Sequence, residues 1–214
     1  YLLGPGPGAD HLAALAAPAL AAGRSALVVV PSTAEAARMA EGLVSHLGAR
    51  VVQAASEDGG AALTAAWEAA MHPGRLVVGT REVALWPVAG LALAVVVDEG
   101  RRGLKERGTP TTHARDLLWH RSAVERFPLV LCGAVPTTEA LHRGPVLLRW
   151  GGRPWGLVEV VDRSAEAPGG GLLGERARQA LRAVVGGGGS AFLLAETRSP
   201  AQRCTGCRTL RVCP

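Results

Sequence analysis

Short apolar segments alternate with amphipathic segments along the first two thirds of the chain. The apolar segments are rich in Val and Leu and end at Pro, Gly or Asp, which is typical of β-strands. Strands are therefore expected at residues 26–30, 50–53, 75–79, 92–98 and 129–133. Apolar positions at helical spacing predict helices at residues 10–21, 33–47, 60–71 and 113–126.

Strands that are apolar on both faces and separated by helices indicate a parallel sheet with helices on both sides. The sequence therefore predicts an α/β fold. The chain has 214 residues, of which 48% are hydrophobic and 19% charged, so a packed core is expected and a disordered chain is excluded. No apolar run approaches the ~20 residues of a membrane-spanning helix, so no membrane segment is expected.

The pattern changes after about residue 145, where turn-forming residues become frequent. A helix is predicted at residues 172–185 and a strand at residues 191–195, with four glycines between them that we interpret as a turn. The chain begins at Tyr1 and ends at Pro214, inside a cysteine cluster. Both ends are interpreted as cuts in a longer chain.

The net charge of +5 favours an anionic partner such as nucleic acid. Lys105 is the one lysine among 23 Lys and Arg residues, and codon bias in a GC-rich genome explains that excess of arginine. Basic residues near the ends of the predicted strands are candidates for salt-sensitive, sequence-independent contacts to DNA, the alternative being a solvated basic face. They are Arg81, Arg101, Arg102, Lys105 and Arg115.

A glycine-rich segment precedes the first helix and contains Gly4, Gly6 and Gly8. Such a loop at a helix N-terminus can hold phosphates with its backbone amides. A nucleoside-triphosphatase loop also needs a lysine and a hydroxyl, but the corresponding positions hold Asp10 and His11. A dinucleotide site needs an acidic residue after the second strand, which is absent. A plain strand-to-helix turn is the better interpretation.

An apolar strand ends in Asp98 and Glu99. Acidic residues at the carboxyl end of a central parallel strand are placed to bind a metal–nucleotide and to orient water. A polar strand end without function fits the same pattern.

Three cysteines, Cys204, Cys207 and Cys213, occur near the end of the chain. Two thiolates on one turn and a third nearby suit a tetrahedral Zn²⁺, with a fourth ligand expected after Pro214. A disulfide is the alternative, although three cysteines cannot all pair. Cys132, on a predicted strand, is interpreted as a small core residue.

Several segments match known motifs in a fixed order along the chain. The first runs from Val78-Gly79-Thr80-Arg81 through Leu85-Trp86-Pro87 to the strand ending in Asp98-Glu99, and it is similar to V-G-T-R-x-A-x-F-x-P…V-D-E-E-H. His113 to Leu117 is similar to Y-H-A-R-D-L-A, and residues 131–139 to L-G-S-A-T-P-S-x-E. Together and in this order, these segments resemble the PriA family of primosomal replication restart proteins, which are superfamily 2 DNA helicases. Residues 191–214 resemble the passage into the family's zinc-binding insert.

The resemblance implies a RecA-like lobe of P-loop NTPase type in residues 1–165, the start of a second lobe in 166–201 and of a zinc-binding region in 202–214. It implies forked or single-stranded DNA and primosome or replisome proteins as partners, Zn²⁺ and ATP with Mg²⁺ as cofactors, and a cytoplasmic, nucleoid-associated protein.

The departures from the family pattern fall on the ATPase segments. The loop lysine is missing, D-E-E-H reads Asp98-Glu99-Gly100-Arg101, and S-A-T-P reads Gly133-Ala134-Val135-Pro136. Phosphoryl transfer depends on positioning and charge neutralisation, which these changes remove. We therefore expect a replication restart protein that binds stalled forks and recruits replisome components without helicase turnover. The alternative is an active ATP-dependent 3′–5′ DNA helicase that uses an unusual nucleotide loop.

Overall fold

The computed structural model describes residues 1–4, 6–54, 59–149, 158–162, 164, 173–194, 202–203 and 210–211. The chain divides into two units, Tyr1–Arg153 and Pro154–Pro214. The first unit ends before the end of the first lobe that the sequence predicts, at residue 165.

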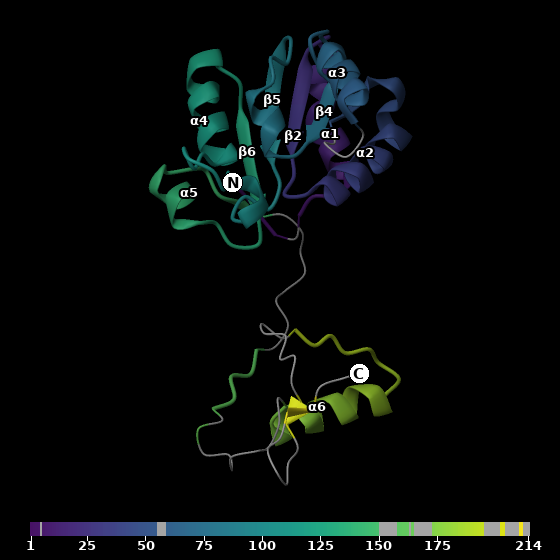
Figure 1. Ribbon diagram of the computed structural model, residues 1–214, viewed down its shortest axis with the longest axis vertical. Helices are drawn as coiled ribbons and strands as arrows, with labels where there is room; N and C mark the ends of the chain where they lie inside the picture. The colour runs from purple at the N-terminus through teal and green to yellow at the C-terminus, as the bar shows by residue number, and fades with distance from the viewer. Residues whose placement is uncertain are drawn as a thin grey trace. The chain divides into compact units, whose positions relative to one another are not determined.

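The first unit is built on a parallel sheet, whose seven strands in the described residues follow the order β3-β4-β2-β5-β6-β1-β7 (Figure 1). The strands are β1 (Leu2–Leu3), β2 (Ser25–Val29), β3 (Val51–Ala54), β4 (Leu76–Gly79), β5 (Leu91–Val96), β6 (Leu129–Gly133) and β7 (Leu148–Arg149). β2 and β5 lie at the centre, and nearly all their residues are buried.

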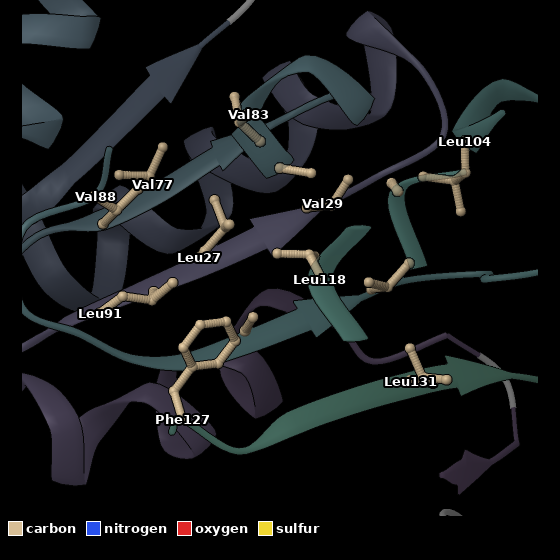
Figure 2. Packing of buried hydrophobic residues seen from close by; sticks show 14 of the residues in the cluster. Leu27, Val29, Val77, Val83, Val88, Leu91, Leu104, Leu118, Phe127 and Leu131 are labelled. Carbon is tan, nitrogen blue, oxygen red and sulfur yellow. The ribbon is translucent and has the colours of Figure 1, made fainter. Parts of the chain in front are cut away.

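Helices cover both faces of this sheet. They are α1 (Ala9–Ala21), α2 (Thr33–Leu47), α3 (Gly59–Ala70), α4 (Ala114–Glu125) and α5 (Thr138–His142), with 3₁₀ helices η1 (Gly48–Arg50), η3 (Arg81–Leu85) and η4 (Arg102–Leu104). Residues of α1 and α2 pack on one face, against alternate residues of β2, β4 and β5. The opposite face packs against α3, α4 and η3, as Figure 2 shows for Leu27 and Val29 of β2 with Leu118 of α4. The remaining residues of these strands therefore form a second core.

Local interactions fix where the helices begin. Ser32 caps α2: its Oγ accepts a hydrogen bond from the Glu35 N–H at 3.3 Å and donates one to Glu35 Oε2 at 2.7 Å. Such a cap satisfies a backbone donor that the first helical turn leaves free. α4 begins after His113, whose Nδ1 accepts a hydrogen bond from the Arg115 N–H at 3.1 Å.

The predicted α/β fold is confirmed, and each predicted element of the first unit has a counterpart within a few residues. Residues 129–133 and 33–47 match β6 and α2 at both ends. β7 and α5, at the end of this unit, were not separately predicted.

In the second unit, the structure contains α6 (Glu175–Gly186) and an antiparallel pair formed by β8 (Gln202–Arg203) and β9 (Leu210–Arg211). The strand predicted at residues 191–195 is wrong for residues 191–194, which are described and are not in a strand. Strands exist by pairing, and in the described residues no neighbour pairs with this segment.

No helix in the described ranges combines the length and the hydropathy needed to cross a bilayer.

Candidate functional site: a closed nucleotide edge

The loops that carry the candidate residues meet at one edge of the sheet. All strands of the sheet are parallel, so the segments that follow β1, β2, β5 and β6 leave at the same edge. The register places Leu3 beside Gly133, and Val96 beside both Val29 and Leu131. In open α/β sheets this carboxyl edge is where ligands bind.

The glycine loop lies directly against the end of β5. A Cβ placed on Gly6 would lie 3.5 Å from Val97 Cγ1 and 3.6 Å from Asp98 Oδ1. A Cβ on Gly8 would lie 2.7 Å from Asp10 Oδ1, so the Asp10 carboxylate folds back over the start of α1. A carboxylate in the first turn interacts favourably with the positive end of the helix dipole. It therefore occupies the place where a phosphate would bind.

Beside this loop is an open cavity of about 280 Å³. Its lining is mostly apolar and includes one acidic and one basic side chain; the lining residues are Gly6, Pro7, Ala9, Val30, Pro31, Glu35, Arg38, Met39 and Val97. The loop thus borders a small, largely apolar hollow, near the lower end of the ~300–1,000 Å³ that is typical of ligand pockets.

Asp98 already has a cation next to it. Its backbone is left-handed, with φ of 50°, and its Oδ2 lies 3.7 Å from Nη1 of Arg101. The same Arg101 nitrogen donates to Glu35 Oε1 at 3.0 Å. Arg101 therefore links the start of α2 to the end of β5 and neutralises carboxylates at the mouth of the cavity.

Glu99 is completely buried and its carboxylate is enclosed by protein donors. Oε2 accepts hydrogen bonds from Arg115 Nη1 at 2.9 Å and from Thr137 Oγ1 at 3.1 Å. Oε1 accepts one from the Thr137 N–H at 2.8 Å, and the Tyr1 hydroxyl lies 3.3 Å away. Glu99 is the acid that would orient water in a nucleotidase, but here its carboxylate has no contact with solvent. Both of its oxygens already accept hydrogen bonds from protein groups.

The network around Glu99 joins four segments of the chain. Arg115, at the start of α4, is 4% exposed and also donates to Thr137 Oγ1 at 2.7 Å. Thr137 caps α5 by accepting from the Ala140 N–H at 3.2 Å. Tyr1 reaches in from beside β1 and lies 3.2 Å from the Val135 carbonyl oxygen. Glu99 is thereby the structural centre of the loops that follow β5 and β6.

The electrostatics of this network follow from burial and pairing. Burial alone would lower the pKa of Arg115, but hydrogen bonds to the carboxylates of Asp116 and Glu99 outweigh burial and raise that pKa. Burial, with the charge of Glu99, raises the pKa of the Tyr1 phenol. The arginine is charged and the phenol neutral at physiological pH, which is the state that lets both donate to Glu99.

His113 is adjacent to this network. Burial lowers the pKa of its imidazole, and the charges of Arg115 and Lys105 act in the same direction. The carboxylates of Asp116 and Glu99 raise the pKa but do not outweigh the other effects. The neutral imidazole is the form that can accept the capping hydrogen bond at Nδ1.

The residues present do not fit ATP with Mg²⁺. The position of the phosphate-binding lysine holds Asp10, a carboxylate that would repel phosphate. Asp98 is next to Arg101 and Glu99 is enclosed, so neither acid is placed as a metal ligand or as a positioner of water. The catalytic role considered for Asp98 and Glu99 in the sequence analysis stays a prediction.

The five basic residues predicted to contact DNA fall into three groups. Arg102 and Lys105 are exposed. Arg81 pairs with Glu82 at 3.2 Å and Glu106 at 3.0 Å, and Arg101 is paired as described. Arg115 is the exception, because burial and the pair with Glu99 remove it from any surface contact.

The predicted metal ligands Cys204, Cys207 and Cys213 lie outside the described residues, and the zinc site stays a prediction. No cluster of metal-ligating side chains is found within the described part of the chain. Cys132 is buried in the sheet, and burial raises the pKa of its thiol to about 12, as expected for an inert core residue.

The sequence did not reveal the partners of Glu99. Tyr1 and Thr137 were not singled out, and Arg115 was assigned to DNA rather than to the buried pair. The one signal available was Thr137, a residue type that commonly caps a helix and does so at the start of α5.

Comparison with known proteins identifies related sequences. The chain is 32% identical over 134 residues to the "Probable replication restart protein PriA" of Mycobacterium leprae, which covers 62% of this chain and 21% of that protein. It is 28% identical over 159 residues to the "Replication restart protein PriA" of Treponema pallidum, covering 69% of this chain and 24% of that protein. The PriA of Synechocystis sp. is 27% identical over 125 residues, which is 58% of this chain and 15% of that protein.

No protein-family model matches the chain. The matched region spans less than a quarter of the length of each of these three relatives. These matches agree with the ordered sequence segments, and they show that this chain is PriA-like, homologous to part of the replication restart proteins.

Proposed function

We propose that this chain is part of a replication restart protein that binds DNA at stalled forks and recruits replisome components without hydrolysing ATP. Its place of action would be the nucleoid, in the cytoplasm. The homology supports the restart role, and the observation that carries the loss of turnover is Asp10, which stands at the position of the phosphate-binding lysine.

The argument from geometry has two steps. A transition-state cation contributes ~10³-fold or more to phosphoryl transfer, and the glycine loop offers an acid where that cation is needed. A general base must also reach the attacking water within about 3 Å, and a fully buried carboxylate with its oxygens engaged by protein donors cannot do so.

The test is ATP hydrolysis by the protein, with and without forked DNA, together with DNA binding under the same conditions. We expect fork binding and no ATP turnover above buffer. DNA-stimulated turnover abolished by Asp98→Asn, a variant at a half-exposed side chain, would instead establish the active helicase. DNA binding without preference for forks would indicate a general interaction module and overturn the restart role.

We also propose that Cys204, Cys207 and Cys213 hold a structural Zn²⁺, which is supported by their spacing and the absence of an interleaved histidine or carboxylate. Zinc content of the purified protein is the measurement. One equivalent that is lost in Cys207→Ser and retained in Cys132→Ser would support the site. A disulfide among these cysteines under reducing conditions would exclude it.

A further inference from the structure

The cavity beside the glycine loop joins two helices to the ends of two strands. Ala9 belongs to α1 and Met39 to α2, while Pro31 follows β2 and Val97 follows β5. Segments that are far apart in the sequence therefore meet around one volume of about 280 Å³. Ligands of open α/β sheets bind at this carboxyl edge, so the cavity has the position of a binding site.

The walls of this cavity are mostly apolar. Val30 is 1% exposed and Val97 is 7% exposed, so both are held in place by the core behind them. Pro7 is also buried, and Ala9 and Met39 are half-buried. Removal of such surfaces from water favours an apolar ligand body, and the small volume limits that body to a compact group such as a single ring.

The acidic side chain in the lining, Glu35, already has protein partners. Its Oε1 accepts a hydrogen bond from Arg101 Nη1 at 3.0 Å, and its Oε2 accepts one from Ser32 Oγ at 2.7 Å. The guanidinium of Arg101 neutralises the charge of this carboxylate. A cationic ligand group would have to compete with Arg101 for Glu35, so the cavity is poorly suited to a cation.

The basic side chain in the lining, Arg38, has no comparable partner. It is exposed, and its Nε donates to the Ala34 carbonyl oxygen one turn earlier at 3.4 Å. Within the described part of the chain, no carboxylate lies within ion-pair distance of this guanidinium. Its two Nη groups are therefore available to an anion, and a guanidinium matches the two oxygens of a carboxylate.

The acids near the cavity restrict a ligand to one negative charge. Asp98 Oδ1 would lie 3.6 Å from a Cβ on Gly6, and Asp10 Oδ1 would lie 2.7 Å from a Cβ on Gly8. Two carboxylates therefore border the glycine loop on the side of the cavity that Gly6 lines. A diphosphate or triphosphate would bring further negative charge toward these acids, whereas a single carboxylate is matched by the single guanidinium of Arg38.

We propose that this cavity binds a small amphipathic monoanion, a compact apolar body that carries one carboxylate, and that Arg38 recognises its charge. The apolar body would contact Val30, Met39 and Val97, and the carboxylate would face the Arg38 guanidinium. The bound ligand would link α1, α2 and the end of β5, and would stabilise the folded arrangement of these elements. This proposal goes beyond the proposed function and depends neither on DNA binding nor on the restart role.

The experiment is NMR titration of the ¹⁵N-labelled chain with three probes of similar shape: the anion phenylacetate, its neutral amide phenylacetamide and the cation phenethylamine. We expect phenylacetate to bind with a dissociation constant of about 1 mM or lower. It should shift the backbone amide signals of Gly6, Ala9 and Val97, which line the cavity. It should also bind about threefold more tightly than phenylacetamide, as is typical of an ion pair with an exposed arginine.

Two variants test the role assigned to Arg38. Arg38→Gln keeps the apolar walls and removes the charge, so it should bind phenylacetate and phenylacetamide with equal affinity. Arg50→Gln removes an exposed arginine that does not line the cavity, so this matched control should keep the threefold preference for phenylacetate.

Several results would overturn the proposal. Absence of phenylacetate binding, or shifts confined to residues outside the cavity, would show that the cavity is not a site for such anions. Tighter binding of phenethylamine would assign the cavity to a cation, and an unchanged preference in Arg38→Gln would remove Arg38 from recognition. Tighter binding of tripolyphosphate than of phenylacetate at the same residues would contradict the restriction to one charge. None of these results concerns fork binding, so the proposed restart role would stand or fall separately.

Discussion

The buried pair of Glu99 and Arg115 makes a prediction that distinguishes a structural carboxylate from a catalytic one. In a working nucleotidase, neutralising the acid that orients water removes turnover and leaves the fold intact. Here both partners are almost completely buried, 0% and 5% exposed at their side chains, and their atoms are 2.9 Å apart. Removing one partner of such a pair leaves a buried charge unpaired, which typically costs about 3–5 kcal/mol.

The losses of stability in the two single variants should differ, because each variant leaves the remaining residue with different partners. Arg115→Met leaves the Glu99 charge with only neutral donors, so we expect a loss of about 3–5 kcal/mol in the free energy of unfolding. Glu99→Gln leaves Arg115 bonded to both oxygens of Asp116, at 3.1 and 3.3 Å, so a smaller loss of about 1–3 kcal/mol is expected.

Urea unfolding followed by tryptophan fluorescence measures these values, and the double variant completes the cycle. We expect the double variant to lose less than the sum of the single losses, by about 1–3 kcal/mol. Arg101→Ala is the control: its side chain is 54% exposed, and loss of its pair with Glu35 should cost about 1 kcal/mol or less. If Arg115→Met stays within 1 kcal/mol of the wild type and the cycle shows no coupling, the argument that Glu99 is structural is refuted.

Three further predictions concern the same edge of the sheet. The first is His113→Asn, which keeps a capping side chain but cannot titrate. Because the pKa of His113 in the folded protein lies below its ordinary 6.5, the wild type should lose stability as the pH falls from about 6.5, and the variant should lose less; equal urea midpoints of the two proteins at all pH values would contradict this. Gly103→Ala should lower the free energy of unfolding by about 1–3 kcal/mol, because its Cβ would lie 2.1 Å from the Pro31 carbonyl oxygen. Gly60→Ala is the control: it has open space around it and should be neutral or stabilising when both variants are compared by thermal melting. Asp10→Lys alone should not produce ATP hydrolysis in a phosphate-release assay, and turnover in that variant would show that the rest of the site is competent.

The fold was largely predictable because its signals are local. The strand at residues 129–133 is a short run closed by Gly133, and the helix at 33–47 begins at a recognisable cap, so both ends of each could be read from neighbouring residues. The strand expected at 191–195 had the same apolar composition, but a strand also needs a partner. Apolar composition alone does not specify that partner.

The candidate site was less predictable because its contacts are distant in sequence. Glu99 is 98 residues from Tyr1, 38 from Thr137 and 16 from Arg115. Those pairings depend on the register of β5 with β6 and of β6 with β1, which no single segment encodes. An arginine on a predicted helix start looks like a surface cation until this register buries it.

The proposed loss of turnover is supported by three arrangements of charged residues at this edge rather than by one missing residue, and two of them, at Asp10 and Arg101, depart from the family pattern. Asp10 stands where a cation is required, Arg101 lies against Asp98 where a metal would be bound, and Arg115 with Thr137 encloses Glu99. Each arrangement also stabilises something: a helix N-terminus, the link between α2 and β5, and the junction of α4 with α5. A substitution that restores one catalytic feature would remove one of these contacts, but the other two arrangements would still block nucleotide chemistry. An edge rebuilt in this way is better suited to hold its loops in one arrangement than to change shape with nucleotide state, and a fixed set of loops is what a surface that binds DNA without hydrolysis requires.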